Sequence, residues 1–282
     1  MRLIRVGESG SESCGVWTSD ESYVDVSDVV DEFDGTFFAN DGIERLRKSI
    51  ANRTPRALEG RRFGPPIGRP QQIVCIGLNY SDHAKETGQA IPDEPIVFNK
   101  APNTLVGPND VVRIPRGSTA TDWEVELGVV IGSRCRYLTD EQAAAARIAG
   151  YVLVNDVSER DFQLNRGGQW VKGKSCETFN PCGPYLVTPD EVEDVLALRM
   201  WLDVNGRRRQ TGSTATMLFS PTAIVHYLSQ FMVLEPGDLI NTGTPPGVGM
   251  GAKPPTFLQP GDLMELGIDG LGVQRLPVRA AD

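Results

Sequence analysis

Apolar residues in this chain occur mostly in short runs that alternate with polar residues and end at glycine, proline or aspartate. Near the N-terminus this pattern predicts strands within residues 3–7 and 15–26, because a period of two places one face of a strand against a core. Residues 72–77 (QIVCIG) form a continuous apolar run that predicts a buried strand. Similar runs fill most of the remaining chain, so strands are expected to dominate the fold.

Three segments instead carry apolar residues at helical spacing. Residues 42–50 (GIERLRKSI) predict one helix. Residues 139–148 predict a second helix with Thr139 as its N-cap, and residues 221–231 a third with Pro221 in the first turn. A few helices among many strands indicate an α+β, β-dominated fold.

A turn-rich segment, RRFGPPIGRP, occupies residues 61–70. Its glycines and prolines oppose both helix and central strand, so we interpret it as a linker. A length of 282 residues allows one domain with a smaller appendage. We therefore expect a small N-terminal domain with its linker at residues 1–70 and a larger domain at residues 71–282.

Composition excludes several classes of function. The chain has 37 acidic and 28 basic residues, a net charge of −9, so the nucleic-acid backbone would be repelled and no nucleic-acid partner is expected. Its longest apolar runs fall far short of the roughly 20 residues that span a bilayer. We expect no membrane partner and a cytoplasmic location.

Cysteine and histidine are scarce. The five cysteines include no C-x-x-C pair, so neither a disulfide framework nor a zinc ribbon is indicated, and reduced, mostly buried thiols are expected. Only His83 and His226 offer imidazole, which makes a zinc site difficult to assemble. Any metal should be held by oxygen ligands.

One predicted strand carries several carboxylates. Residues 121–131 (TDWEVELGVVI) place Asp122, Glu124 and Glu126 on one face by alternation. The strand continues into an apolar run that looks buried on both faces, where three like charges would raise one another's pKa values unless a cation lies among them. A divalent cation would resolve this conflict.

A fourth carboxylate ends another predicted strand within residues 150–157, where Asp156 follows an apolar run. Together with Glu124 and Glu126 it would form a site of three carboxylates, whose hard oxygen ligands suit Mg²⁺, Mn²⁺ or Ca²⁺. The alternative is a solvated acidic strand face with a capping aspartate. The pattern alone leaves both interpretations open.

His83 and Glu86 lie three residues apart in a polar segment after the strand at residues 72–77. On a short helix they would face the same way, so the carboxylate could hold the imidazole as a base. The alternative is that His83 only caps or packs. His226, among apolar neighbours, is interpreted as an ordinary helix residue.

The segment GQWVKGKS at residues 168–175 fits the phosphate-loop pattern G-x-x-x-x-G-K-[ST]. A phosphate loop follows a buried strand and opens a helix. Here residues 161–167 are too polar for a central strand, and residues 176–184 contain two prolines and a glycine that oppose a helix. A nucleotide hydrolase is therefore the less favoured interpretation of Lys174.

Taken together, these motifs resemble the fumarylacetoacetate hydrolase family over roughly residues 70–275. The resemblance rests on GLNYSDHAKETG, DWEVELGVVIG, GYVLVNDVSERDFQ, GQWVKGKSCETFNPCGP and GDLINTGTPPGVG, in the family's order and spacing. It implies the family's mixed β-roll catalytic domain, usually dimeric, with a small N-terminal domain. The sequence is most similar to bacterial members labelled ureidoglycolate lyases or sugar-acid dioxo hydrolases.

The resemblance also assigns roles to residues. It implies three carboxylate ligands for Mg²⁺ or Mn²⁺, with Ca²⁺ as a substitute, and a catalytic pair of His83 and Glu86. It further implies that four polar side chains contact the substrate, with Lys174 also acting in catalysis, and that the segment between two of them is a lid. The ligands are Glu124, Glu126 and Asp156; the substrate contacts are Arg160, Gln163, Lys174 and Thr244; the lid lies between Gln163 and Lys174.

The expected activity is hydrolysis of the C3–C4 bond of a 2,4-dioxo acid, an acylpyruvate or a 2,4-dioxo-3-deoxy sugar acid, with release of pyruvate. The sugar acid is the leading substrate. The complete pair of His83 and Glu86 favours hydrolysis, because a decarboxylase needs no attacking water. Two alternatives on the same site are a decarboxylase of oxaloacetate or another 2-oxo acid, and an isomerase of the 2-hydroxyhepta-2,4-diene-1,7-dioate type.

Overall fold

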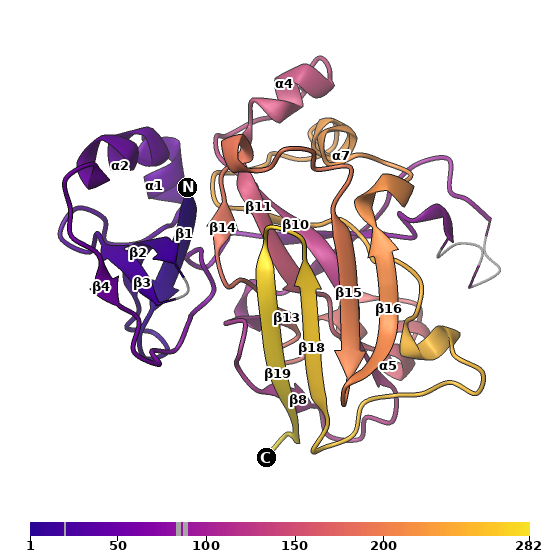
Figure 1. The fold of residues 1–282 in the computed structure, drawn as a ribbon. Coiled ribbons are helices and arrows are strands. Elements are labelled where there is room, and N and C mark those ends of the chain that lie inside the picture. Colours follow the sequence, from indigo (N-terminus) through magenta and orange to yellow (C-terminus); the bar gives the residue numbers. More distant parts are fainter. Residues whose placement is uncertain (20, 83–85, 87–89) are drawn as a thin grey trace.

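The structure, a computed structural model, describes residues 1–282 except 20, 83–85 and 87–89. Its largest sheet has ten strands and its second sheet has five, so the predicted β-dominated fold is confirmed (Figure 1). In order across the large sheet the strands are β4 (Arg56–Ala57), β3 (Ser22–Asp25), β2 (Ser13–Ser19), β1 (Arg2–Val6), β14 (Leu186–Val187), β11 (Ile148–Asn155), β10 (Val125–Ile131), β17 (Leu239–Asn241), β5 (Ile73–Gly77) and β6 (Ile96–Lys100). The second sheet runs β16 (Arg207–Ser213), β15 (Arg199–Val204), β18 (Leu263–Ile268), β19 (Gly272–Ala280) and β8 (Val112–Ile114).

Two short ladders and several helices complete the described part of the chain. The ladders are β9 (Thr121–Asp122) with β12 (Ser158–Glu159), and β7 (Leu105–Val106) with β13 (Asn180–Pro181). The α-helices are α1 (Gly35–Ala39), α2 (Gly42–Ile50), α4 (Glu141–Ala145), α5 (Arg160–Leu164), α6 (Val171–Lys174) and α7 (Pro221–Leu228). Single 3₁₀ turns are η1 (Pro102–Thr104), η2 (Pro189–Glu191), η3 (Thr214–Thr216) and η4 (Gly249–Gly251).

Strands β10 and β11 form the centre of the molecule. Every residue of both strands is buried. They pair antiparallel, with Val125 opposite Asn155 and Glu126 opposite Val154. Strands β15 and β18 of the second sheet also contact β10, which explains why its sequence is apolar on both faces (Figure 1).

The N-terminal strands continue the large sheet instead of forming a sheet of their own. Strand β1 pairs antiparallel with β14, where Arg2 lies opposite Val187 and Leu3 opposite Leu186. One buried apolar cluster includes Leu3, Cys14, Val16, Phe33, Phe37, Ile73, Cys75, Val152, Leu186 and Leu239. Apolar packing thus extends across residues 61–70, and the expected division of the chain after residue 70 stays a prediction.

The predicted helices exist, but their limits differ. Helix α2 has the predicted bounds. The second helix is shorter than predicted and begins at Glu141, because Asp140 and not Thr139 caps it by accepting a hydrogen bond from the Ala143 N–H at 2.7 Å. Helix α7 starts at Pro221 as predicted but ends at Leu228.

The predicted strand at residues 121–131 is interrupted. Strand β9 ends at Asp122 and β10 begins at Val125. The Asp122 carboxylate accepts hydrogen bonds from the N–H groups of Trp123 at 2.8 Å and Gly249 at 2.6 Å, which holds the backbone in a turn there. The interruption places Glu124 outside the regular ladder, at the edge of a cavity.

All five cysteines are free thiols, and four of them are buried, as the sequence predicts. Among the described residues, no helix is both long and apolar enough to cross a membrane.

Candidate active site

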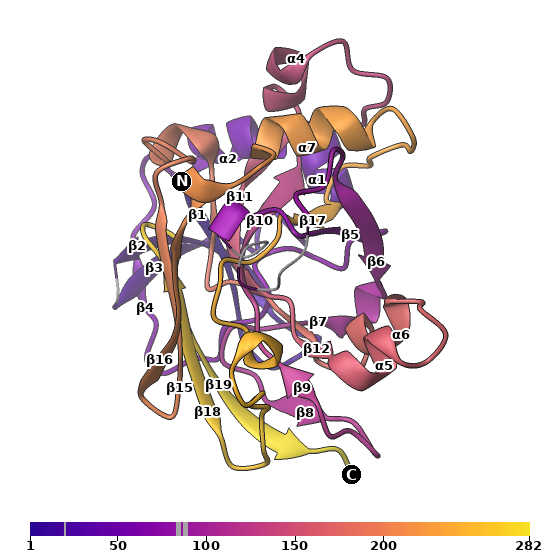
Figure 2. The same ribbon diagram turned by 90° about the vertical axis from the view of Figure 1, so that its right-hand side faces the viewer.

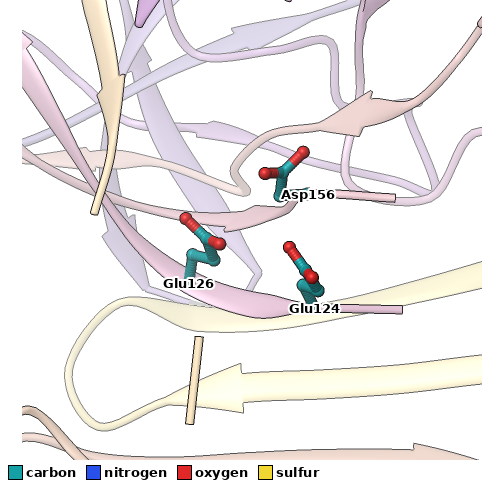
Figure 3. Close-up of side chains that lie close together, drawn as sticks. All are labelled: Glu124, Glu126 and Asp156. Carbon is teal, nitrogen blue, oxygen red and sulfur yellow. The ribbon is translucent and has the colours of Figure 1, made fainter. Parts of the chain in front are cut away.

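Three carboxylates meet where β10 and β11 lie side by side. Glu124 precedes β10, Glu126 lies within it, and Asp156 directly follows β11. The Asp156 N–H donates to the Glu124 carbonyl oxygen at 2.9 Å, which fixes the two strand ends against each other. Figure 3 shows the three side chains converging, and one carboxylate oxygen from each lies within 4.8 Å of those of the other two.

All three side chains are buried, with exposed fractions of 6%, 1% and 0% for Glu124, Glu126 and Asp156. A solvated acidic strand face therefore does not describe them. Asp122, which alternation places on the same face, is not a member of the cluster. It accepts hydrogen bonds from backbone N–H groups of the η4 turn and from Arg160 Nε at 2.9 Å.

Two basic side chains neutralise part of this charge. Lys174 Nζ lies 2.8 Å from both Glu124 Oε2 and Asp156 Oδ2. Arg160 Nη2 lies 2.6 Å from Glu124 Oε1. Burial by itself raises the pKa of Glu124, but Lys174 and Arg160 outweigh it and lower that pKa to about 2.

The same balance keeps Lys174 charged. Burial lowers its pKa, but the carboxylates of Asp156 and Glu124 have the larger combined effect and raise it above the usual value for lysine. At neutral pH Lys174 is therefore an ammonium ion inside the carboxylate cluster.

Glu126 is the carboxyl group that lacks a basic partner among the described residues. Its carboxylate accepts a hydrogen bond from the Gly243 N–H, which donates to Oε2 at 2.8 Å. Burial and the nearby charges of Asp156 and Glu124 raise its pKa well above the ordinary value. Such a carboxyl needs a proton or a cation, so the hard oxygen donors here fit a divalent cation such as Mg²⁺.

Lys100, which ends β6, belongs to the site although the sequence motifs do not indicate it. Its side chain is fully buried, and Nζ donates to Asp156 Oδ1 and to the carbonyl oxygens of Val157 at 3.1 Å and Phe179 at 2.6 Å. The sequence signal that could have identified Lys100 is the one that indicates Asp156: a charged residue at the end of an apolar run. It could not show which partner lies opposite, because β6 and β11 are not neighbours in the sheet.

A cavity of about 80 Å³ opens beside the carboxylates. Its lining residues are Ile76, Gly77, Leu78, Phe98, Glu124, Glu126, Arg160, Gln163, Leu164, Trp170, Lys174, Thr244 and Met250. All four predicted substrate contacts line this cavity. Their contact with a substrate stays a prediction.

These four side chains differ in how many of their hydrogen-bond donors and acceptors remain free for a ligand. Arg160 Nη1 donates to Gln163 Oε1 at 3.1 Å, so each guanidinium nitrogen has a partner. Thr244 Oγ1 donates to the Val125 carbonyl at 2.9 Å and accepts from Gln210 Nε2 at 2.8 Å. Gln163 Nε2, by contrast, donates no hydrogen bond to any residue of the described part of the chain.

The predicted pair of His83 and Glu86 can be followed only in part, since His83 lies outside the described residues. Glu86 is exposed, and its carboxylate accepts a hydrogen bond from the Gly247 N–H, with N···O distances of 3.0 and 3.1 Å. It therefore lies against the loop that leads to η4, close to the cavity residue Met250. The pairing itself stays a prediction.

The GQWVKGKS segment does not have the surroundings of a phosphate loop. The segment before it contains helix α5 and no strand, and after it residues 176–179 form no helix before β13 begins at Asn180. Lys174 is held by buried carboxylates, which would repel a phosphate. The predicted lid region is exposed from Leu164 to Gln169.

A β-rich fold with a buried acidic cluster that could hold a metal, beside a small cavity, is the geometry of an enzyme centre. Residues 72–279 match the family described as fumarylacetoacetate (FAA) hydrolase C-terminal. The chain belongs to the fumarylacetoacetate hydrolase family.

Relatives support the same assignment over the whole length. A protein of Burkholderia ambifaria named "Putative hydrolase" is 50% identical over 282 residues, which is 100% of both chains. Among solved structures, fumarylacetoacetate hydrolase from Exiguobacterium antarcticum is 34% identical with a TM-score of 0.85, covering 100% of both chains. A 5-carboxymethyl-2-hydroxymuconate delta-isomerase from Mycobacterium smegmatis is 30% identical with a TM-score of 0.79, also covering 100% of both chains.

Proposed function

We propose that this protein is a divalent-metal-dependent hydrolase that cleaves the C3–C4 bond of a 2,4-dioxo acid and releases pyruvate and a carboxylic acid. The observation that carries the proposal is the buried cluster of Glu124, Glu126 and Asp156 beside the Lys174 ammonium, in one small cavity. Such an arrangement suits a reaction in which negative charge develops on an oxygen next to a carbonyl group.

Glu124, Glu126 and Asp156 would hold Mg²⁺ or Mn²⁺, with Ca²⁺ as a substitute. A bound ion of this kind would supply Lewis acidity to the 2-oxo group and the carboxylate of the substrate. Gln163 Nε2 would donate a hydrogen bond to the same end of the substrate, since it lies beside Arg160 and donates to no other described residue.

Lys174 would stabilise the leaving group. When the C3–C4 bond breaks, the electron pair moves toward the 2-oxo oxygen and forms the enolate of pyruvate. The buried ammonium of Lys174 would donate a hydrogen bond to that oxygen, and it stays protonated because its pKa is raised. Protonation of C3 then completes pyruvate.

The attacking water would be deprotonated by His83, oriented by Glu86. Hydroxide would add to C4, and the acyl part would leave as a carboxylic acid. The hydrogen bond from the Gly247 N–H to the Glu86 carboxylate supports this proposal, because it restricts the side chain that would orient His83.

An isomerase acting at the same site is the second candidate. Three of the similar solved structures carry the name of an isomerase. An isomerase moves a proton between carbons and needs no attacking water. The two reactions therefore differ in whether pyruvate appears.

The metal site is tested by isothermal titration of the purified protein with Mg²⁺ and Mn²⁺. We expect Glu124→Gln or Asp156→Asn to weaken binding at least about tenfold, because each removes one charged ligand. Glu193→Gln, at an exposed position, serves as the control and should bind like the wild type. Unchanged affinity in both cluster variants would contradict the proposed site.

The reaction is tested with acylpyruvates, oxaloacetate and dioxo sugar acids, each assayed for pyruvate in the presence of Mg²⁺, with decarboxylation followed as CO₂ release. Hydrolysis predicts pyruvate and a carboxylic acid in equal amounts from the dioxo acids. His83→Ala should lose this hydrolysis yet keep metal and oxalate binding. Turnover by His83→Ala at the wild-type rate would assign the base to another group.

A further inference from the structure

Polar and apolar side chains share the lining of the cavity. Its polar and charged lining residues are Glu124, Glu126, Arg160, Gln163, Lys174 and Thr244. Most of their donors and acceptors already serve one another or the backbone. The rest of the described lining is apolar, apart from Gly77: Ile76, Leu78, Phe98, Leu164, Trp170 and Met250.

Leu78 is held in this lining by an unusual backbone conformation. Its φ is +50°, in the left-handed region that a branched side chain rarely adopts. The next residue, Asn79, is fully buried and held by hydrogen bonds. Its side-chain amide donates to the carbonyl oxygens of Phe219 at 3.0 Å and Thr242 at 2.8 Å and accepts from the Phe219 N–H at 2.8 Å.

A conformation of this kind persists only where its surroundings enforce it, and it is concentrated at functional sites. Glycine or asparagine would occupy position 78 with less strain. The chain instead has leucine at this position. We infer that the strained backbone is kept because it places the isobutyl group of Leu78 in the cavity wall.

Trp170 also contributes to the lining of the cavity. Its ring packs edge-to-face on Phe98, with centroids 5.2 Å apart, where α6 lies beside β6 (Figure 2). A Cβ added at Gly77 would lie 2.9 Å from Trp170 Cζ3, so the six-membered part of the indole contacts the backbone there. The indole N–H lies on the opposite side of the ring system.

We propose that the substrate carries an alkyl or aryl group beyond its dioxo end, instead of the hydroxylated chain of a sugar acid, and that Leu78 and Trp170 select that group. The inference rests on the proposed hydrolysis of a 2,4-dioxo acid and narrows its substrate class. Hydroxyl groups placed against the side chain of Leu78 and the six-membered rings of Phe98 and Trp170 would lose hydrogen bonds to water, and these hydrocarbon surfaces offer no hydrogen-bond partner in return.

The test compares two acids of equal length, 2,4-dioxohexanoate and 5,6-dihydroxy-2,4-dioxohexanoate, by pyruvate release in the presence of Mg²⁺. We expect kcat/KM of the wild-type protein to be at least about tenfold greater for the alkyl acid, within the range that apolar pockets achieve against added hydroxyl groups. Equal values, or a preference for the hydroxylated acid, would overturn the proposal.

Variants of Leu78 and Trp170 test whether these two residues cause the preference for the alkyl acid. Leu78→Asn suits the backbone at this position and places an amide in the wall, so it should reduce the ratio of the two kcat/KM values severalfold. Leu196→Asn, on an exposed turn outside the cavity, should leave the ratio unchanged. Trp170→Ala should impair the alkyl acid more than the hydroxylated one, whereas Val171→Ala, at the next and exposed position, should not.

A separate binding measurement distinguishes failure of this inference from failure of the proposed function. Isothermal titration in the presence of Mg²⁺ compares 2-oxohexanoate with its 5,6-dihydroxy analogue, neither of which can be cleaved as a 2,4-dioxo acid. Tighter binding of 2-oxohexanoate, without pyruvate from either dioxo acid, would retain the apolar selectivity and reject the hydrolase. Pyruvate release without any preference would do the opposite.

Discussion

Glu126 is the acidic residue of the cluster whose charge is not balanced by a basic side chain in the described structure. Because its pKa is raised, the metal-free protein keeps this carboxyl group protonated at pH values above 4.5, the ordinary pKa of glutamate. A divalent cation must displace this proton, so metal binding and proton release are coupled. The metal-free and metal-bound proteins should therefore respond differently to pH.

We expect Mg²⁺ binding to release a proton from Glu126 and to strengthen as pH rises toward the raised pKa. Because that pKa is raised, the contribution of Glu126 to the stability of the metal-free protein is complete below pH 4.5 and is lost as pH rises through the folded-state value. Titration in two buffers of different ionisation enthalpy measures the released protons. Glu126→Gln should release none, and a wild-type protein that releases none would contradict this account.

Lys100 is expected to stabilise the folded protein through its buried contacts with the carboxylate cluster. Lys100→Met removes a buried ammonium and leaves Asp156 Oδ1 and two backbone carbonyls without their donor, so the free energy of unfolding should fall by about 3–5 kcal/mol. Urea unfolding of the metal-free protein measures this loss. Lys48→Met, at an exposed position of α2, should change it by less than about 0.5 kcal/mol. Equal effects of the two substitutions would show that Lys100 does not stabilise the cluster.

At residue scale the carboxylates were predictable and their partners were not. Alternation within one strand is local, so it indicates that Glu124 and Glu126 share a face. The departure of Asp122 depends on N–H groups of the distant η4 turn, and the role of Lys100 depends on packing between strands far apart in sequence. Sequence periodicity contains neither contact.

Elements show the same limit at their ends. The apolar pattern predicts that α2, α4 and α7 exist, but α4 begins at Glu141 because the Asp140 carboxylate reaches the Ala143 N–H. Two adjacent residues, Thr139 and Asp140, could both serve as caps, and sequence does not choose between them.

Close packing between β11 and β14 depends on Gly150. A Cβ added at Gly150 would lie 2.4 Å from the Val187 carbonyl oxygen, so Gly150→Ala must push β14 away from β11. We expect the melting temperature to fall and amides of β1 to exchange faster, because β1 pairs with β14. Gly10→Ala, where nothing lies within 4 Å of the added Cβ but φ is +82°, should cost only about 1 kcal/mol. Equal effects would mean that the sheet accommodates the methyl group at Gly150.

For the whole molecule, the shared apolar cluster predicts one cooperative unfolding transition. Leu3, Phe33 and Phe37 pack in the same cluster as Ile73 and Val152, so neither part can unfold without exposing apolar surface of the other.

Hydrogen exchange as a function of urea concentration measures this cooperativity. Peptides from β2 and β10 should lose protection at the same midpoint, whereas the exposed segment 165–169 should exchange without urea. Loss of protection in β2 at a clearly lower urea concentration would support two independently stable domains divided after residue 70.

The pairing of β1 with β14 also limits how this protein can be recombined with its relatives. A segment joined only by a linker could be exchanged between proteins as a cassette. Here an exchanged N-terminal segment would have to supply an edge complementary to Leu186 and Val187 and side chains that fill the space around Ile73 and Val152. Chimaeras cut at residue 70 should therefore fold only when both halves of this interface come from the same parent.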